Sequence, residues 1–310
     1  MAGILILSVV GLFSQLVDGS LGMGFGVISS TLLIAVGIAP AAVSSTVHLA
    51  KIGTGVASGL SHWKFGNVDW RVTSLLAVPG AVGAFGGAVL LSSLSAEVAA
   101  PWVSLLLFGL GGYVLWRFAV LAGARPVING RLSRNLLAPL GLVGGALDSL
   151  GGGGWGPIGT TTLLSSGRLE PKKVVGSVST AELVVALGSS AGFLVGLGSA
   201  GINVGWVLAL LVGGVIGAPF AAWVVQHMRP RMLGVLAGGL IVITNTITMM
   251  QSWFGLELTS AVMWVVVAAL TAAWSVVVRR TLLDEREKTR RAAAVALEAD
   301  PNASETAVDA

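Results

Sequence analysis

The chain has 310 residues, of which 55% are hydrophobic and only 10% are charged, and its formal net charge is +4. Because a soluble domain carries roughly 25% charged residues, this composition excludes an ordinary water-soluble globule and indicates a protein that lies in lipid. The absence of cysteine excludes a disulfide framework and a thiolate metal site. Most lysines and arginines lie in short loops between apolar runs, so nucleic-acid binding is not expected.

Apolar runs follow one another along the whole chain, separated by short polar loops. Some are near the roughly 20 residues that a membrane-spanning helix needs: 41–60, 71–92, 101–121, 174–198, 204–226, 232–250 and 259–278. Others are shorter and come in two pairs, 3–17 with 26–38 and 136–147 with 155–166. A glycine-rich break with an aspartate divides each pair. We therefore predict an all-α polytopic membrane protein in which each short pair forms a re-entrant hairpin.

The second half of the chain repeats the first. Asp18 and Phe25 correspond to Asp148 and Trp155, and the glycines around them match in the same order. Such self-similarity indicates a duplicated unit. The predicted parts are a first transmembrane repeat at 1–122, a basic linker at 123–134, a second repeat at 135–252, an additional helix at 259–278, and a polar, disordered tail at 279–310.

Loop charge predicts how these helices are oriented, since cytoplasmic loops are enriched in Lys and Arg. Basic residues lie around 62–71, at 117–134, at 168–173 and at 279–280, which places these loops and the C-terminal tail inside. Each repeat then holds one hairpin and three spanning helices, an odd number that inverts the second copy. The N-terminus is outside if the first hairpin is re-entrant and inside if it spans. Inverted repeats with broken helices are typical of secondary transporters, whose solute sites lie near the midplane.

Several stretches resemble a known family. They are the glycine-rich run 22–26, the run Ser61-His62-Trp63-Lys64-Phe65-Gly66-Asn67-Val68-Asp69, and the segments 151–161 and 172–182 of the second half. Together they are similar to the TauE/SafE sulfite exporter family over most of residues 8–275. The resemblance implies a transport protein of the cytoplasmic membrane, in several members for sulfite, sulfonates or related organosulfur anions. It does not fix the solute.

Four charged residues fall inside apolar segments or their breaks: Asp18, Lys51, Asp148 and Glu182. Charges at membrane depth are costly, so each is a functional hypothesis. Lys51 and Glu182 are equivalent positions of the two repeats, which predicts an ion pair near the midplane. Either this pair is structural, or Lys51 binds the anion while Glu182 takes part in proton coupling.

His48 lies one helical turn before Lys51 and is either part of a proton relay or a packing residue. Asp18 and Asp148 either cap the helices that follow the breaks or handle protons or cations.

The glycine breaks predict the solute site. Free backbone N–H groups at two half-helix N-termini, brought together by the repeat, bind an anion; the alternative is that the glycines only permit tight packing. The predicted substrate-binding residues are Gly22, Gly24, Phe25, Gly26, Gly152, Gly154, Trp155, Gly156, Thr161 and Lys51. The predicted coupling or gating residues are Glu182, His48, Asp18 and Asp148.

These patterns favour a secondary transporter of a small anion, and the family resemblance implies export of sulfite, a sulfonate or a related organosulfur anion. The alternatives are a proton- or cation-coupled uptake permease and an anion channel. An enzyme is not expected, because the chain has neither a Walker motif nor a dinucleotide-binding fingerprint after a strand. No cofactor and no metal are expected. The expected partners are a small inorganic or organic anion and membrane lipid, and the sequence is compatible with a homo-oligomer.

Overall fold

A computed structural model describes residues 2–21, 23–120, 132–199, 202–227 and 230–299. Within these ranges every regular element is helical. Gly22 and almost all of the predicted basic linker lie outside the described residues.

The first half of the chain folds as a helical hairpin followed by three long helices. Helix α1 (Ala2–Leu21) and helix α2 (Phe25–Ala35) run antiparallel, since Ser29 Oγ donates to Ser14 Oγ at 2.8 Å. Three helices follow: α3 (Pro40–Lys64), α4 (Trp70–Ser92) and α5 (Ala96–Val120). The predicted helix break between 17 and 26 is therefore confirmed, with α1 longer than the apolar run suggested.

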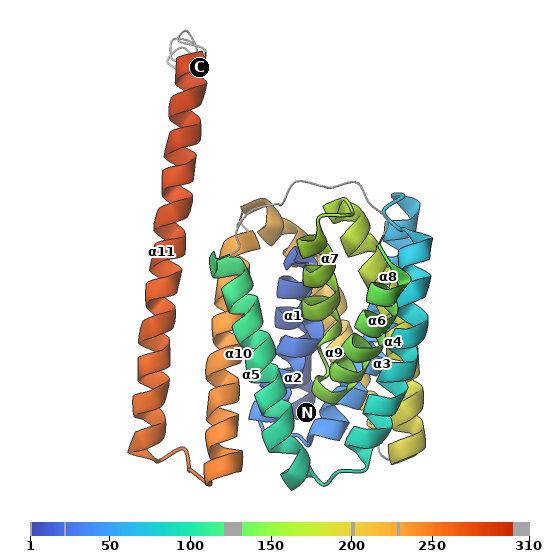
Figure 1. Ribbon diagram of the computed structural model, residues 1–310. Coiled ribbons are helices and arrows are strands. Elements are labelled where there is room, and N and C mark those ends of the chain that lie inside the picture. Colours follow the sequence, from blue (N-terminus) through green and yellow to red (C-terminus); the bar gives the residue numbers. More distant parts are fainter. Residues whose placement is uncertain (1, 22, 121–131, 200–201, 228–229, 300–310) are drawn as a thin grey trace.

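The second half shows the same order of elements. Helix α6 (Arg134–Gly151) turns back into a π-helical turn (Gly156–Thr160) that continues as α7 (Thr161–Ser166). Long helices follow: α8 (Pro171–Leu197), α9 (Val204–His227) and α10 (Pro230–Phe254). The predicted break between 147 and 155 is confirmed as well. A last helix, α11 (Ala261–Ala299), stands beside the bundle, where it packs against α10 (Figure 1).

Helix length and composition fit a bilayer. Among the described residues, five helices are long and apolar enough to cross a membrane: α4, α5, α8, α10 and α11. Helix α3 is just as long but carries serine, threonine, histidine and lysine along its buried side. Large apolar side chains such as Phe85, Leu194 and Val265 are exposed on the outside of the bundle. Since water would disfavour such a surface, it is the surface of a protein surrounded by lipid.

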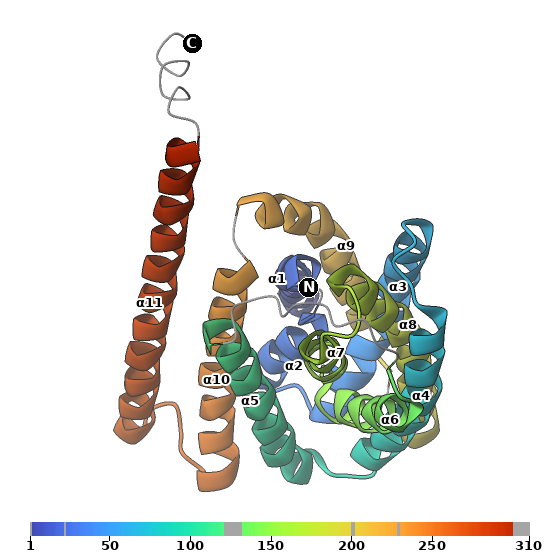
Figure 2. The same ribbon diagram turned by 45° about the horizontal axis from the view of Figure 1, so that its top comes forward.

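The helices pack closely because glycines, which have no side chain, lie where the helices cross. Helix α6 lies along α4, where a Cβ on Gly83 would overlap the carbonyl oxygen of Leu142. Helix α1 lies along α9, where a Cβ on Gly217 would press on the carbonyl oxygen of Leu12. Without a hydrophobic drive between helices in lipid, this backbone contact supplies the packing energy. Figure 2 shows the result, with the short helices α2 and α7 near the middle of the bundle, between α5 on one side and α3 and α8 on the other.

Helix α11 continues beyond its apolar part as far as Ala299, whereas the sequence analysis expected disorder from Arg279 onwards. The physical reason is composition: Glu, Lys, Arg and Ala are strong helix formers. Pairs such as Glu287 with Arg291, four residues apart at 3.7 Å, add support. Residues 300–310 lie outside the described residues.

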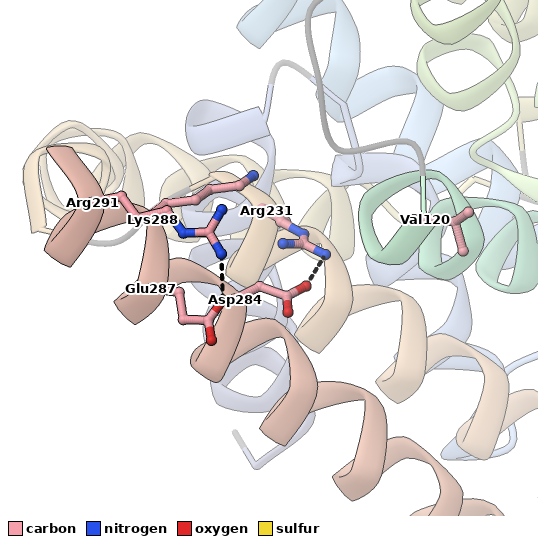
Figure 3. A pocket seen from close by; sticks show the side chains of 6 residues that line it. All are labelled: Val120, Arg231, Asp284, Glu287, Lys288 and Arg291. Carbon is pink, nitrogen blue, oxygen red and sulfur yellow. Dashed lines mark hydrogen bonds and ion pairs between the residues drawn. The ribbon is translucent and has the colours of Figure 1, made fainter.

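A salt-bridge cluster ties α11 to the bundle. Arg231 at the start of α10 pairs with Asp284 at 3.1 Å and Glu285 at 3.5 Å, and it also donates to the carbonyls of Phe118 and Ala119. Figure 3 shows the cavity of about 270 Å³ beside this cluster. It is lined by Val120, Arg231, Asp284, Glu287, Lys288 and Arg291. Because basic and acidic groups alternate and pair here, the cluster serves as an anchor.

The Gly83→Ala variant tests the glycine crossings. Its methyl group would overlap the α6 backbone, so we expect the free energy of unfolding to fall by about 1–3 kcal/mol. Gly86→Ala, on the open side of the same helix with nothing within 4 Å, is the matched control and should not lower stability. Thermal unfolding in detergent, followed by size-exclusion chromatography, measures both. Equal melting temperatures for the two variants would contradict this packing account.

Candidate functional site

The two hairpin breaks meet in the middle of the bundle. A Cβ on Gly26 would overlap the carbonyl of Gly152, and one on Gly153 would overlap the backbone of Val27. Gly152 also adopts φ +72°, which glycine tolerates and other residues rarely do. Glycine at these positions therefore serves close approach of the two breaks.

Each break is held by the aspartate that precedes it. Asp148 Oδ1 accepts hydrogen bonds from the backbone N–H groups of Gly154 at 2.7 Å and Trp155 at 2.9 Å. Asp18 Oδ1 accepts one, from Phe25 N at 3.1 Å. The capping interpretation of the two aspartates thus matches the geometry. The N–H groups that were expected to bind an anion donate to these carboxylates instead.

Lys51 lies between two carboxylates. Its Nζ is 2.9 Å from Glu182 Oε1, as the ion pair predicted from the sequence requires, and 3.1 Å from Asp148 Oδ1. The side chains of Lys51 and Asp148 are 4% and 0% exposed, whereas that of Glu182 is 27% exposed. Sequence reasoning missed the contact between Lys51 and Asp148. Asp148 is therefore a fixed partner of Lys51, and Glu182 is the partner that solvent reaches.

His48 supports this cluster from the side. The ring is fully buried, its Nε2 lies 3.2 Å from the carbonyl oxygen of Asp148, and it stacks on Phe193 with ring centroids 6.3 Å apart. Its Nδ1 lies 3.8 Å from Asp148 Oδ2. These contacts fit the packing interpretation of His48, because both ring nitrogens face Asp148 and the ring fills a gap against α8.

A polar cavity of about 460 Å³ leads away from the cluster. It reaches from Lys51 and Glu182, near the middles of α3 and α8, to His62 and Val175 near the basic ends of these helices. Its lining is Gln15, Asp18, Leu21, Lys51, Thr54, Gly55, Ser58, His62, Val175, Ser179 and Glu182. On the side of Lys51 that faces the start of α3, Ser44 Oγ donates to the carbonyl of Ser149 at 2.6 Å and so ties α3 to the end of α6.

The remaining predicted residues lie around the breaks. Gly24, Gly26 and Gly156 line a narrow cleft together with Lys51 and Glu182, whereas Gly154 serves the Asp148 cap. Within the described ranges, no group of three or more histidine or acidic side chains is placed to hold a metal ion.

The two aromatic residues of the breaks fill helix crossings. Trp155 is 1% exposed, its ring packs against Gly80, and its Nε1 donates to the carbonyl of Val178 at 3.0 Å. Phe25 is 3% exposed and its ring faces Gly214. Both rings therefore have packing roles in this structure, which is the alternative to gating.

The threonines of the half-helices bond to α5 and α10. Thr161 Oγ1 accepts a hydrogen bond from Tyr113 Oη at 2.7 Å, and Thr31 Oγ1 accepts one from Asn245 Nδ2 at 2.8 Å. Thr161 Oγ1 also donates to the carbonyl of Pro157. These bonds hold the half-helices in place and use the hydroxyl that was predicted to contact solute.

An apolar helical bundle with a buried charge cluster at the end of a polar cavity has the architecture of a membrane transporter. Residues 7–247 match the family model described as sulfite exporter TauE/SafE. A relative from Bacillus subtilis (strain 168), described as "Probable membrane transporter protein YtnM", is 47% identical over 277 residues, which cover 88% of this chain and 91% of the relative. The chain belongs to the TauE/SafE family and is a multi-pass membrane transporter, as the sequence resemblance predicted.

One solved structure is also similar over most of its length. It is described only as the crystal structure of a protein, is 20% identical, and covers 89% of this chain and 98% of its own. Its TM-score of 0.30 is too low to inform the fold.

Replacing the two aspartates by alanine tests their unequal roles. Asp148→Ala removes a buried ion-pair partner and leaves two buried N–H groups without an acceptor, so the free energy of unfolding should fall by about 3 kcal/mol or more. Asp18→Ala removes one partly buried cap bond and should cost about 1 kcal/mol. Thermal unfolding in detergent gives the comparison, and a larger loss for Asp18→Ala would overturn the assignment.

Proposed function

We propose that the protein is a secondary transporter of a small anion, in particular sulfite, a sulfonate or a related organosulfur anion. The observation that carries this proposal is the buried ammonium group of Lys51 at the inner end of a polar cavity, with one fixed and one solvent-reached carboxylate. The family description supports the organosulfur class. A solute anion binds Lys51 by taking the place of Glu182.

The exchange of Glu182 for solute has an electrostatic requirement. Two carboxyl groups, from Asp148 and Glu182, contact the ammonium group of Lys51, and a third, from Asp18, lines the same cleft. An anion that arrives while all three are ionised adds to an excess of negative charge, which is costly in a low dielectric. Proton uptake by Glu182 removes that excess and frees Lys51. Transport is therefore coupled to a proton, and Glu182 is its carrier.

We further propose that the two halves are inverted repeats. Matched contacts support this arrangement. Leu12 contacts Gly217 as Leu142 contacts Gly83, and the Phe25 ring lies on Gly214 as the Trp155 ring lies on Gly80. The bonds from Asn245 to Thr31 and from Tyr113 to Thr161 are equivalent too. The pairing of Lys51 with Glu182 then joins the same position of each repeat across the pseudo-symmetry axis.

Loop charge supports an orientation for the cavity. The end of the bundle at which α3 ends and α8 begins carries Lys64, Lys172 and Lys173, with Lys173 bonded to the carbonyl of Gly66 (Figure 1). The positive-inside rule assigns this end to the cytoplasm, so the cavity opens inward and the C-terminal helix ends inside. A membrane potential negative inside drives net negative charge outward by about 2.3 kcal/mol per charge per 100 mV, so it favours export of a solute whose negative charge exceeds that of the proton moving with it.

Access to the cavity can be measured directly, because the chain has no cysteine. A cysteine that replaces Ser58, in the cavity wall, should react with a membrane-impermeant maleimide only from the cytoplasmic side of oriented vesicles. Ser95→Cys, in the exposed turn between α4 and α5 at the other end, should react only from outside. Labelling of Ser58→Cys only from outside would reverse the proposed orientation.

Flux in proteoliposomes tests the function itself. We expect saturable movement of sulfite or a sulfonate, dependent on an imposed pH gradient and reduced at least about tenfold by Lys51→Gln. Lys172→Gln is the matched control, since this lysine is 65% exposed and, within the described part of the chain, forms its ion pair with Glu170 near the surface. Sulfate and chloride serve as comparison anions. If no organosulfur anion moves, the proposed solute class is wrong; if flux ignores the pH gradient, the coupling role of Glu182 is wrong.

A further inference from the structure

The carboxylate of Asp18 is more available than that of its repeat partner. Asp148 is fully buried and accepts hydrogen bonds from Gly154 N, Trp155 N and Lys51 Nζ. From the described residues Asp18 accepts a single hydrogen bond, from Phe25 N, and no basic group of these residues lies within ion-pair distance of it. Asp18 also lines the 460 Å³ cavity, which Asp148 does not. Of the two aspartates, Asp148 therefore has a structural role, and Asp18 presents its negative charge to the cavity.

A further polar side chain lies beside Asp18 on the cavity wall. Gln15, one helical turn earlier on α1, has a side-chain oxygen that is buried and accepts no hydrogen bond from the described residues. Glu182, on the facing helix α8, supplies the other carboxylate of the cavity. A cavity wall with two carboxylates to the one ammonium group of Lys51, and with the amide of Gln15 beside them, suits a group that brings several N–H donors and a positive charge. An ammonium group has three such donors.

We propose that the solute is a small zwitterion, whose ammonium group binds Gln15, Asp18 and Glu182 while its acidic group binds Lys51. This inference rests on the proposed function and narrows the solute class within it. The ammonium group compensates the carboxylates that would repel a plain anion. Hydroxyl groups of Thr54, Ser58 and Ser179 complete the polar wall. Among the described residues, the wall has no aromatic side chain besides the imidazole of His62 at its rim, which fits a short aliphatic solute.

A matched pair of solutes tests this proposal. 2-Aminoethanesulfonate and 2-hydroxyethanesulfonate have the same length and the same sulfonate, and they differ in the ammonium group alone. We expect proteoliposomes with the natural sequence to transport the amino compound with at least about tenfold higher kcat/KM, a factor that corresponds to about 1.4 kcal/mol. Because the zwitterion is neutral overall, the coupled proton is the only net charge that moves, so an imposed membrane potential should act on the flux as it acts on a single positive charge.

Two variants test whether the preference for 2-aminoethanesulfonate depends on Asp18 and Gln15 of the cavity wall. Asp18→Asn keeps an acceptor for Phe25 N and removes one negative charge from the cavity wall. It should reduce transport of the amino compound about tenfold, and it should not reduce that of the hydroxy compound. Gln15→Leu should move the same ratio in the same direction by a smaller factor, and it keeps the test usable if Asp18→Asn does not fold. Thermal unfolding of each variant, with and without 2-aminoethanesulfonate, reports folding and binding separately.

The outcomes separate this inference from the proposed function. Equal transport of both sulfonates overturns the zwitterion and leaves the anion transporter standing. Loss of both solutes to the same extent in Asp18→Asn, at unchanged stability, also overturns it, because the aspartate would then serve transport in general. If neither these sulfonates nor sulfite moves or binds, the proposed function fails together with the inference.

Discussion

The burial of one ammonium group constrains the centre of this protein. Lys51 is 4% exposed in the middle of α3, and a lone charge there would be too costly to keep. Asp148 and Glu182 provide the compensating charge from α6 and α8. Because a buried ion pair is stable only when its remaining hydrogen-bond sites are satisfied, Asp148 must itself be fixed. The backbone N–H groups of the second helix break do this, so the break and the charge cluster form one unit.

This arrangement depends on glycine. The carboxylate can cap the half-helix and reach Lys51 only if the two breaks cross at backbone distance, which Gly26, Gly152 and Gly153 allow. Further out, glycines of α4 and α9 let α6 and α1 lie against them, so each hairpin is held along its length. The high glycine content of the chain, 44 residues, thus has a geometric cause at the crossings.

The two halves use the same backbone plan for different purposes. In the second half the aspartate is buried, Trp155 fills the crossing, and Tyr113 bonds to Thr161. In the first half Asp18 borders a cavity. The repeated order of elements therefore gives a packed side that holds the charge of Lys51 and a side that borders the cavity. The proposed mechanism uses both, because Lys51 stays in place while Glu182 exchanges with solute.

The sequence by itself determined the class of protein, both helix breaks, and the ion pair of Lys51 with Glu182. It did so because apolar run length, glycine clusters and repeat equivalence are local or periodic properties. Only the tertiary structure decided that Asp148 is the second partner of Lys51, that the break N–H groups face aspartates, and that the cavity lies beside Asp18. Lys51 and Asp148 are 97 positions apart, and no periodicity sets the distance between side chains on different helices. The helical course of 279–299 was missed for a different reason: polar composition alone predicted disorder, whereas strong helix formers and the Arg231 anchor extend α11.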